Sequence, residues 1–328
     1  MRPAISPRVL HVAARQDFTD RFAADVRYYM TQQPRQLPSR YFYDELGSSL
    51  FEAICRLPWY PITTAERRLL DAHAREILDR ARPSVVVELG SGSGDKMRRL
   101  LIAREQDRSL DVHLVDLSAS ALDQSSRLLA PLDGVRLTLH RASYEEGLGA
   151  AVASFVPGAR ALVLFLGSNI GNFDPPSRDA LLSGIRRTLR QGDRLLIGAD
   201  LVKPEQDLLL AYDDPLGVTA AFNRNLLVRV NRELEADFQL DQFSHRAVWN
   251  EPASRMEMHL IAGSRQHVEV RRCDLAFDLE AGEPIWTESS YKFHPETMMQ
   301  SLQSAGFRSA AQWIDPVGRF ALTLADAL

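Results

Sequence analysis

Strand and helix patterns alternate along the middle of the chain. The run SVVVELG at 84–90 is a β-branched apolar segment, and it follows a helical pattern over 64–81 in which Leu70 and Ile77 lie on one face. The same rhythm repeats several times. Because helices cross over between parallel strands, this alternation predicts a doubly wound, Rossmann-like α/β sheet.

The units predicted by this pattern follow one another without long interruptions. Strands are expected at 84–90, 111–117, 135–140, 159–167 and 193–201. Helices are expected between them at 95–104, 118–130 and 177–189. The tail adds a helix at 295–306 and a pair of strands at 307–315 and 319–325.

The pattern changes after residue 201. Two helical patterns occupy 205–235, and in the second Phe222, Leu226 and Val230 recur every four residues. Four runs then alternate apolar and polar residues, as a half-solvated antiparallel sheet requires. These runs are 245–250, 255–262, 267–277 and 285–293.

The change in pattern indicates two domains. Residues 1–60 are helical and aromatic-rich, and prolines break them into short pieces. We expect a cofactor-binding α/β domain from residues 61–200 plus 287–328. We expect a second, α+β domain for the substrate from residues 1–60 plus 201–286.

The composition and the charge argue against several classes of protein. The 328 residues are 45% hydrophobic and 25% charged, which is typical of a globular protein. The net charge of -4, without a polybasic run, argues against nucleic-acid binding. No apolar stretch reaches the length of a membrane span and no export signal is visible, so we expect a cytoplasmic protein without a membrane partner. We also expect a monomer.

Cysteine and histidine usage predicts neither a disulfide framework nor a metal site. Cys55 and Cys273 lie far apart and lack ligand-like spacing. The eight histidines form no motif with metal-ligand spacing. We therefore expect no bound metal.

The strongest chemical motif is ELGSGSGDK at 88–96, between a strand and a helix. Gly90, Gly92 and Gly94 allow a tight turn and a close approach of the backbone to a ligand. A nicotinamide fingerprint would place its third glycine at position 95, where the chain has Asp95. The spacing favours S-adenosylmethionine, and we expect the loop, with Ser91 and Lys96, to bind it.

Further cofactor residues are expected where later strands end. Asp116 is placed to accept hydrogen bonds from both ribose hydroxyls. Ser143 and Tyr144 follow the strand at 135–140, where an adenine would lie, and Gly167 follows the strand at 159–167. The alternative is a glycine-rich turn of any doubly wound fold, with Asp116 only capping the helix at 118–130.

Several segments together resemble the ergothioneine-pathway histidine N-alpha-methyltransferases, and the resemblance covers nearly the whole chain. The most specific is AYDDPLGVTAAFNRNLLVRVNRELEADF at 211–238, which generic methyltransferases lack. The others are 40–66, ELGSGSGDK, FLGSNIGNF, 255–262 and 287–293. The resemblance implies that the chain trimethylates L-histidine through its mono- and dimethyl forms, with S-adenosylmethionine as donor.

The resemblance also implies roles for individual residues. Tyr43 and Tyr60 match catalytic tyrosines of the substrate pocket. The residues that match substrate contacts are Asn172 and Tyr212 at the amino-acid head group, Glu288 and Ser290 at the imidazole, and Met258 along the ring. Ser143 stands where the family commonly has Asp, and since a serine hydroxyl can still accept one bond from the adenine amine, we expect weaker cofactor binding at most.

The chemistry agrees with these roles. Methyl transfer from a sulfonium to an amine is an in-line displacement that requires proximity and alignment. The nucleophile must be a neutral amine, and tyrosine hydroxyls near it can accept its hydrogen bonds. A buried carboxylate such as Glu288 can form a charge-assisted bond with an imidazole, worth roughly 1.5–3 kcal/mol.

Three other functions remain open at this point. A methyltransferase for tryptophan or tyrosine would lack the imidazole carboxylate, whereas Glu288 is present. A silent S-adenosylmethionine-binding protein would have lost the substrate residues. A nicotinamide oxidoreductase is disfavoured by the glycine spacing.

Overall fold

The computed structural model describes residues 8–12, 15–105 and 109–328 in two compact units. The first unit contains 8–12, 62–202 and 293–328, and the second contains 15–61 and 203–292. Within the described residues, no helix combines the length and the apolar composition needed to cross a bilayer.

The first unit is built on an eight-stranded sheet with the order β1-β5-β4-β3-β6-β7-β14-β13. The neighbours from β1 to β7 are parallel, and β14 is antiparallel to β7 and β13. The strands are β1 (Arg8–Val12), β3 (Val85–Leu89), β4 (Leu110–Asp116), β5 (Val135–Arg141), β6 (Ala161–Phe165), β7 (Arg194–Asp200), β13 (Phe307–Asp315) and β14 (Phe320–Ala327).

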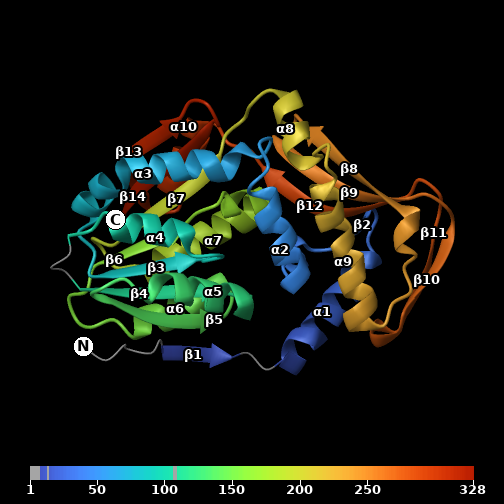
Figure 1. The fold of residues 1–328 in the computed structure, drawn as a ribbon, viewed down its shortest axis with the longest axis horizontal. Helices are drawn as coiled ribbons and strands as arrows, with labels where there is room; N and C mark the ends of the chain where they lie inside the picture. The colour runs from blue at the N-terminus through green and yellow to red at the C-terminus, as the bar shows by residue number, and fades with distance from the viewer. Residues whose placement is uncertain (1–7, 13–14, 106–108) are drawn as a thin grey trace. The chain divides into compact units, whose positions relative to one another are not determined.

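Helices flank this sheet (Figure 1). They are α3 (Pro61–Ala81), α4 (Asp95–Ile102), α5 (Ala119–Leu129), α6 (Tyr144–Ala153), α7 (Pro175–Thr188) and α10 (Pro295–Ser304), with the short η2 (Asn169–Asn172). The strand order reverses at β3, since the chain runs outward through β4 to β5 and then returns to β6 and β7. Right-handed crossovers therefore place α4 and α5 on one face and α6 and α7 on the other.

Burial explains why β3 and β6 lie at the centre. Every residue of Val85–Leu89 and of Ala161–Phe165 is buried, as strands covered by helices on both faces require. The carboxyl ends of β3 and β6 meet at the point where the strand order reverses, and ligands of such sheets bind at that edge. The fold therefore places the glycine loop after β3 at the expected binding edge.

The second unit contains a four-stranded sheet with the order β2-β12-β9-β8 and a separate hairpin of β10 and β11. Its strands are β2 (Arg35–Gln36), β8 (Phe243–Asn250), β9 (Arg255–Ala262), β10 (Gln266–Val270), β11 (Leu275–Leu279) and β12 (Pro284–Tyr291). Its helices are α1 (Arg15–Met30), α2 (Glu45–Ile54), α8 (Glu205–Tyr212) and α9 (Val218–Leu234), with η1 (Ser39–Tyr41), η3 (Leu240–Gln242) and η4 (Arg271–Cys273).

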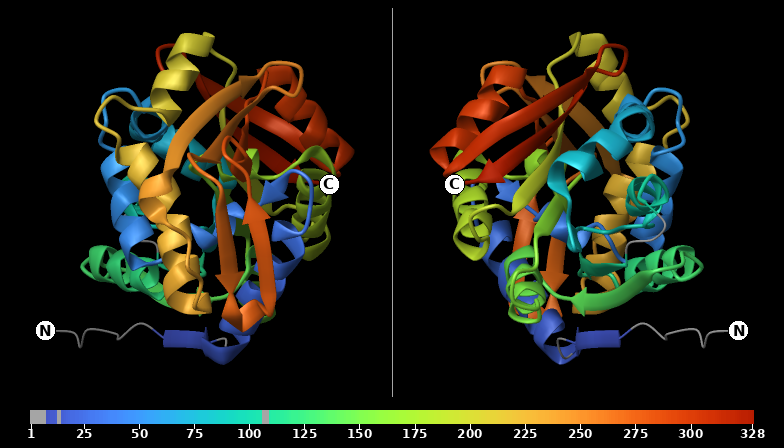
Figure 2. Two further views of the ribbon diagram at one scale, coloured as in Figure 1. Left: turned by 90° about the vertical axis from the view of Figure 1, so that its right-hand side faces the viewer. Right: turned by 90° about the vertical axis from the view of Figure 1, so that its left-hand side faces the viewer.

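Helices α8 and α9 pack against β8 and β9, and α2 packs against α9. In the left view of Figure 2 the strands β8 to β12, in orange, lie beside α9, in yellow. Along β9 the buried residues alternate strictly with half-buried ones, which places Met256, Met258 and Leu260 on the helix-covered inner face. This inner face carries Met258, which the sequence predicts along the substrate ring.

The α/β architecture agrees with the sequence prediction, and three details differ. Residues 8–12 form β1, which pairs with β5 in the first unit, whereas a helical second-domain segment was expected there. Residues 287–292 belong to the second unit, because β12 pairs with β9 and β2. The expected strand at 267–277 is two strands, β10 and β11, separated by η4.

Candidate functional site

The glycine loop after β3 is held by backbone hydrogen bonds. The amides of Gly90 and Ser91 both donate to the carbonyl of Val115 in β4, over 2.8 and 3.2 Å. The amide of Gly92 donates to the Asp116 carboxylate over 3.0 Å. The loop, which follows β3, is thereby tied to the end of the neighbouring strand β4, and Gly94 caps α4.

Two glycines of this loop are required for different reasons. Gly90 has φ +79°, and a Cβ there would lie 2.8 Å from the Asn169 amide and 3.3 Å from the Tyr144 hydroxyl. Gly92 has φ +51°, and a Cβ there would meet nothing within 4 Å. The first glycine permits close packing and the second faces open space, so the loop leaves room for a ligand.

The Asp116 carboxylate accepts hydrogen bonds from both the glycine loop and the start of the next helix. One carboxylate oxygen accepts the Gly92 amide, and the other accepts the Ser118 amide over 2.9 Å. Burial raises the pKa of Asp116, while these backbone bonds oppose the rise. Each oxygen keeps a second lone pair, so the carboxylate can also accept hydroxyls of a ribose.

Ser143 and Tyr144 begin α6, a helix that the sequence prediction treated as a loop. Ser143 is its N-cap and forms a capping box with Glu146, accepting the Glu146 amide and donating to the Glu146 carboxylate over 2.9 Å. The Tyr144 ring contacts Phe165 with centroids 5.2 Å apart, and burial raises the pKa of its hydroxyl. Ser143 thus has a structural task beside its expected contact with adenine.

Gly167 and Lys96 are held by Glu66, a residue that the sequence prediction missed. Glu66 lies on α3 with 1% of its surface exposed and accepts the Gly167 amide with both oxygens, over 2.8 and 3.0 Å. Its carboxylate also lies 3.3 Å from the Lys96 ammonium. A Cβ on Gly198 would lie 2.3 Å from Glu66, so β7 makes room for this buried charge.

Glu88 was also missed, although it begins the ELGSGSGDK motif. It is fully buried at the end of β3, and neither carboxylate oxygen has a hydrogen-bond partner among the described residues. Burial raises its pKa to about 8, against the opposing charge of Lys96. An orphaned buried carboxyl requires a compensating group, and S-adenosylmethionine carries two cationic groups. The residues therefore fit this cofactor.

A β-bulge in β12 determines the face of the sheet on which the predicted substrate residues of this strand lie. Trp286 pairs with His259 and Glu288 pairs with Met258, which leaves Thr287 as an extra residue. Because one extra residue reverses the alternation, Glu288 follows the same face as Met258 instead of the face of Trp286. The Thr287 hydroxyl holds the bulge by donating to the Met258 carbonyl over 2.9 Å.

Beyond the bulge, polar side chains of β12 meet the end of α8. The Tyr212 hydroxyl donates to Ser290 Oγ over 2.8 Å. The Lys292 ammonium donates to the same Ser290 oxygen over 2.8 Å and to the Tyr212 hydroxyl over 2.7 Å. Burial raises the pKa of Glu288 to about 7, and the Lys292 charge opposes this rise.

The backbone of Tyr212 is fixed by His245 on β8. The Asn223 amide lies 2.9 Å from His245 Nδ1 and can only donate to it. The Nε2–H therefore donates to the Tyr212 carbonyl over 2.8 Å. Burial lowers the pKa of His245, which keeps this neutral tautomer.

Tyr43 and Tyr60 join this group through aromatic contacts. Tyr60 lies edge-on to Tyr212 with centroids 6.3 Å apart, and Phe51 lies between Tyr60 and Tyr43 at 6.3 and 5.5 Å. Burial, aided by Tyr212 and other nearby acidic groups that include Glu288, raises the pKa of Tyr60 well above its usual value. Its hydroxyl stays protonated, so it can orient an amine but not deprotonate an ammonium.

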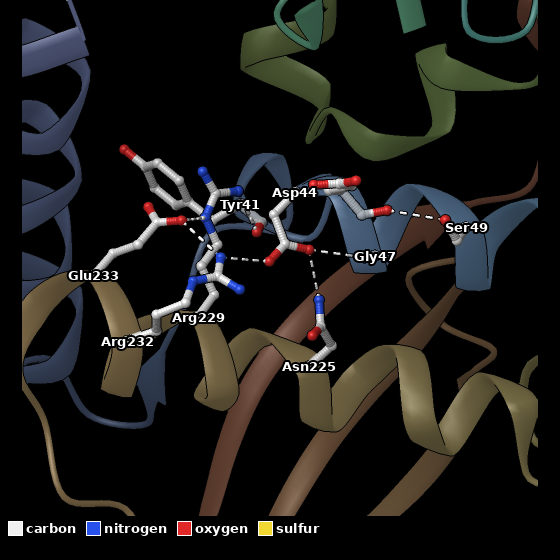
Figure 3. A network of polar contacts seen from close by, with 9 residues as sticks. Tyr41, Asp44, Gly47, Ser49, Asn225, Arg229, Arg232 and Glu233 are labelled. Carbon is white, nitrogen blue, oxygen red and sulfur yellow. Dashed lines mark hydrogen bonds and ion pairs between the residues drawn. The ribbon is translucent and has the colours of Figure 1, made fainter. Parts of the chain in front are cut away.

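A polar network anchors the segment that carries Tyr43 (Figure 3). Asp44 caps α2 by accepting the Gly47 amide over 2.7 Å, and it also binds Asn225 over 2.8 Å and Arg232 over 2.7 Å. Burial opposes ionisation of Asp44, but these hydrogen bonds outweigh it and lower its pKa. Arg229, also on α9, donates to the Tyr41 carbonyl over 2.8 Å. The backbone is thus fixed on both sides of Tyr43.

The structure brings six expected residues together in the second unit. We call this group, with Lys292 added, the substrate cluster, and its members are Tyr43, Tyr60, Tyr212, Met258, Glu288, Ser290 and Lys292. Asn172 lies in the first unit, at the end of η2 after β6. In the described part of the chain, no group of three or more histidine, cysteine or acidic side chains could hold a metal ion.

Comparisons with known proteins show the family of the chain. Residues 22–327 match the family described as histidine-specific, S-adenosylmethionine-dependent methyltransferases. The chain is 45% identical over 304 residues to a histidine N-alpha-methyltransferase of Mycolicibacterium smegmatis, with 92% of this chain and 93% of that protein covered. The corresponding enzyme of Mycobacterium tuberculosis is 43% identical over 303 residues, with the same coverage.

A more distant relative is ergothioneine biosynthesis protein 1 of Schizosaccharomyces pombe. It is 30% identical over 290 residues, which cover 85% of this chain and 37% of that longer protein. The family match spans both units and includes every predicted site residue. The chain therefore belongs to the histidine-specific, S-adenosylmethionine-dependent methyltransferase family.

Proposed function

We propose that the chain transfers methyl groups from S-adenosylmethionine to the α-amino nitrogen of L-histidine, up to trimethylhistidine (hercynine), in ergothioneine biosynthesis. The observation that carries this proposal is the bulge in β12, which puts Glu288 and Ser290 on one face beside Tyr212. A carboxylate and a hydroxyl at this spacing offer an acceptor and a donor to the two ring nitrogens of an imidazole.

The first unit holds the cofactor in this proposal. Gly90, Ser91, Gly92 and Gly94 supply the loop, Asp116 accepts the ribose hydroxyls, and Ser143 and Tyr144 lie where adenine would bind. Lys96 and Gly167 are fixed by Glu66. The bound cofactor supplies an electrophilic methyl group on a positively charged sulfur. Glu88 contributes a buried carboxyl group, whose ionised form the positive charge of the bound cofactor would favour.

The substrate cluster binds and orients the amine. Tyr43 and Tyr60 accept hydrogen bonds from the amine and direct its lone pair, while Tyr212 lies beside the substrate carboxylate with its hydroxyl hydrogen donated to Ser290. The first-unit Asn172 is assigned to the same head group. Since Tyr60 has a strongly raised pKa, the amine must arrive deprotonated. Alignment of nucleophile and methyl group then supplies most of the rate enhancement.

Specificity for histidine depends on Glu288. A tryptophan indole offers one N–H and no lone pair, so it can pair with Glu288 but leaves the buried Ser290 hydroxyl without an acceptor, and leaving a buried polar group unpaired costs about 1–3 kcal/mol. Met258 lies opposite Glu288 across the strands and supplies an apolar contact for the ring. A methyltransferase for another amino acid is therefore disfavoured.

The test is a direct assay. Purified protein, S-adenosylmethionine and equal concentrations of histidine, tryptophan and tyrosine are incubated together, and the products are weighed by mass spectrometry. Histidine carrying one, two and then three added methyl groups is expected. Methylated tryptophan or tyrosine in excess over methylated histidine would refute the substrate assignment, and no methylation of any of them would support a silent binding protein.

We further propose that the protein acts as a cytoplasmic monomer.

A further inference from the structure

Lys292 is a buried lysine that the function described above does not use. It directly follows β12 and exposes 3% of its surface. Its ammonium lies 2.8 Å from Ser290 Oγ, 2.7 Å from the Tyr212 hydroxyl and 4.6 Å from the centre of the Tyr212 ring. One cation thus touches the residue assigned to the ring and the residue assigned to the carboxylate.

The contact with Lys292 sets the direction of the hydrogen bonds at Ser290. An ammonium has three donors and no acceptor, so Ser290 Oγ must accept from Lys292. The same oxygen accepts from the Tyr212 hydroxyl. Both lone pairs of Ser290 are then used, and the hydroxyl hydrogen remains to be donated. Ser290 is therefore a fixed donor, whereas a serine in water can either donate or accept.

We propose that Lys292 is a positioning residue that locks Ser290 as a hydrogen-bond donor, so that the substrate cluster selects the neutral form of an imidazole. This inference rests on the proposed function. A neutral imidazole offers one N–H to Glu288 and one lone pair to Ser290. An imidazolium, an indole and a pyrrole all lack that lone pair, and each would leave the Ser290 hydrogen facing no acceptor.

Two substitutions of Lys292 separate this role from a merely structural one. Lys292→Gln introduces a carbonyl oxygen that can accept from Ser290, which allows the serine to reverse its direction. Lys292→Arg keeps a cation with donors only. The substrates compared are histidine and the two alanines that carry a pyrrole ring, which have an N–H but no lone pair.

The wild-type protein should prefer histidine over both pyrrolylalanines by about 100-fold or more, because a site built for a hydrogen bond rejects an analogue without the partner. Lys292→Gln should raise the KM for histidine about tenfold and reduce this preference at least about fivefold. Lys292→Arg should retain most of the preference. Ser289→Ala, on the opposite face of β12, is the matched control and should leave the KM and the preference within about twofold.

A double substitution tests whether Lys292 acts through Ser290. In a Ser290→Ala background, Lys292→Gln should raise the KM for histidine less than about threefold further, since the hydroxyl that it controls is gone. Affinity for S-adenosylhomocysteine, measured by calorimetry, should stay within about twofold in every variant. If the Gln variant does not fold, Lys292→Met is used in the same cycle.

Two results would overturn the inference: an unchanged preference in Lys292→Gln, or a full tenfold effect of that substitution in the Ser290→Ala background. Either result would show that Lys292 only packs against its neighbours. Neither result would contradict methylation of histidine by the wild-type protein. A wild-type protein that does not methylate histidine would refute the proposed function itself.

Discussion

The cofactor loops of the first unit and the substrate cluster of the second unit bind ligands by different means. In the loops, backbone amides and glycines set the geometry, and the supporting contacts are main-chain bonds such as those from Gly90 and Ser91 to Val115. In the cluster, side chains from segments far apart in the sequence carry the chemistry, and a single extra residue, Thr287, decides which face they share.

This difference separates a general from a specific function. A glycine loop at the reversal point of a parallel sheet suits any ligand of the right size and charge. The cluster distinguishes one amino acid from another, because its half-buried Glu288 and fixed Ser290 must each find a partner. Changes in the loops should therefore affect cofactor affinity, and changes in the cluster should affect substrate choice.

The largest effect is expected from Gly90→Ala. The new Cβ would lie 2.8 Å from the Asn169 amide, and alanine is strained at φ +79°. At roughly 1–3 kcal/mol for the strain alone, affinity for S-adenosylhomocysteine should fall up to about 100-fold by calorimetry. Gly149→Ala is the control, since its Cβ would meet nothing within 4 Å. Unchanged affinity in Gly90→Ala would contradict the role of the loop.

Exchanging Thr287 and Glu288 should change the substrate cluster and leave the cofactor loops intact. In the double variant Thr287→Glu with Glu288→Thr, the carboxylate lies at the extra residue of the bulge instead of opposite Met258. We expect kcat/KM for histidine to fall about 100-fold, with S-adenosylhomocysteine affinity retained. Thr287→Ala keeps Glu288 opposite Met258 and should cost much less. An exchanged variant that melts like the wild type and retains histidine turnover would show that the position of the carboxylate after the bulge does not control turnover.

The buried carboxyl groups predict how stability depends on pH. The folded pKa of Glu88 is raised to about 8, so the folded state retains a proton that the unfolded state releases near 4.5. The stabilisation is complete below about 4.5 and is lost as pH rises through about 8. Without cofactor, the free energy of unfolding should fall by about 2 kcal/mol more between pH 6 and 8 in the wild type than in Glu88→Gln. Identical pH profiles in denaturant melts would contradict this assignment.

The pH dependence of turnover tests the protonation state of the amine and not the division between loops and cluster. An α-amino group with a pKa near 8 or above is mostly protonated at neutral pH, and the raised pKa of Tyr60 prevents it from acting as a base. With saturating histidine, kcat should rise by up to about tenfold per pH unit from pH 6 until the amine is deprotonated. A flat profile from about pH 6 to 9 would show that deprotonation of the amine does not control the rate.

The same contrast explains what the sequence predicted. The doubly wound sheet followed from local periodicity, and Gly90, Gly92 and Gly94 followed from their spacing after a buried strand. The helix α6 was missed, although Ser143 and Glu146 form the S-x-x-E pattern of a capping box. Strand β1 was missed because its partner strand, β5, lies more than a hundred residues away.

Three residues of the site could not be predicted from the sequence, for related reasons. Glu66 and Glu88 occupy buried positions where a carboxylate is costly, and only the tertiary fold shows what surrounds them. Lys292 was left aside because its two hydroxyl partners come from α8 and β12. The resemblance to a family identified Glu288 and Ser290, but the bulge that aims them is visible only in the register of β12 with β9.

The central claim is that substrate choice resides in the cluster and cofactor affinity in the loops. The most direct measurement is made on one preparation of Glu288→Ala, in which kcat/KM for histidine and the Kd for S-adenosylhomocysteine are determined together. With roughly 1.5–3 kcal/mol lost from the charge-assisted bond, kcat/KM should fall about 10- to 150-fold. The Kd for S-adenosylhomocysteine should stay within about twofold. Unchanged efficiency toward histidine, or a Kd that rises together with the loss of efficiency, would contradict the account.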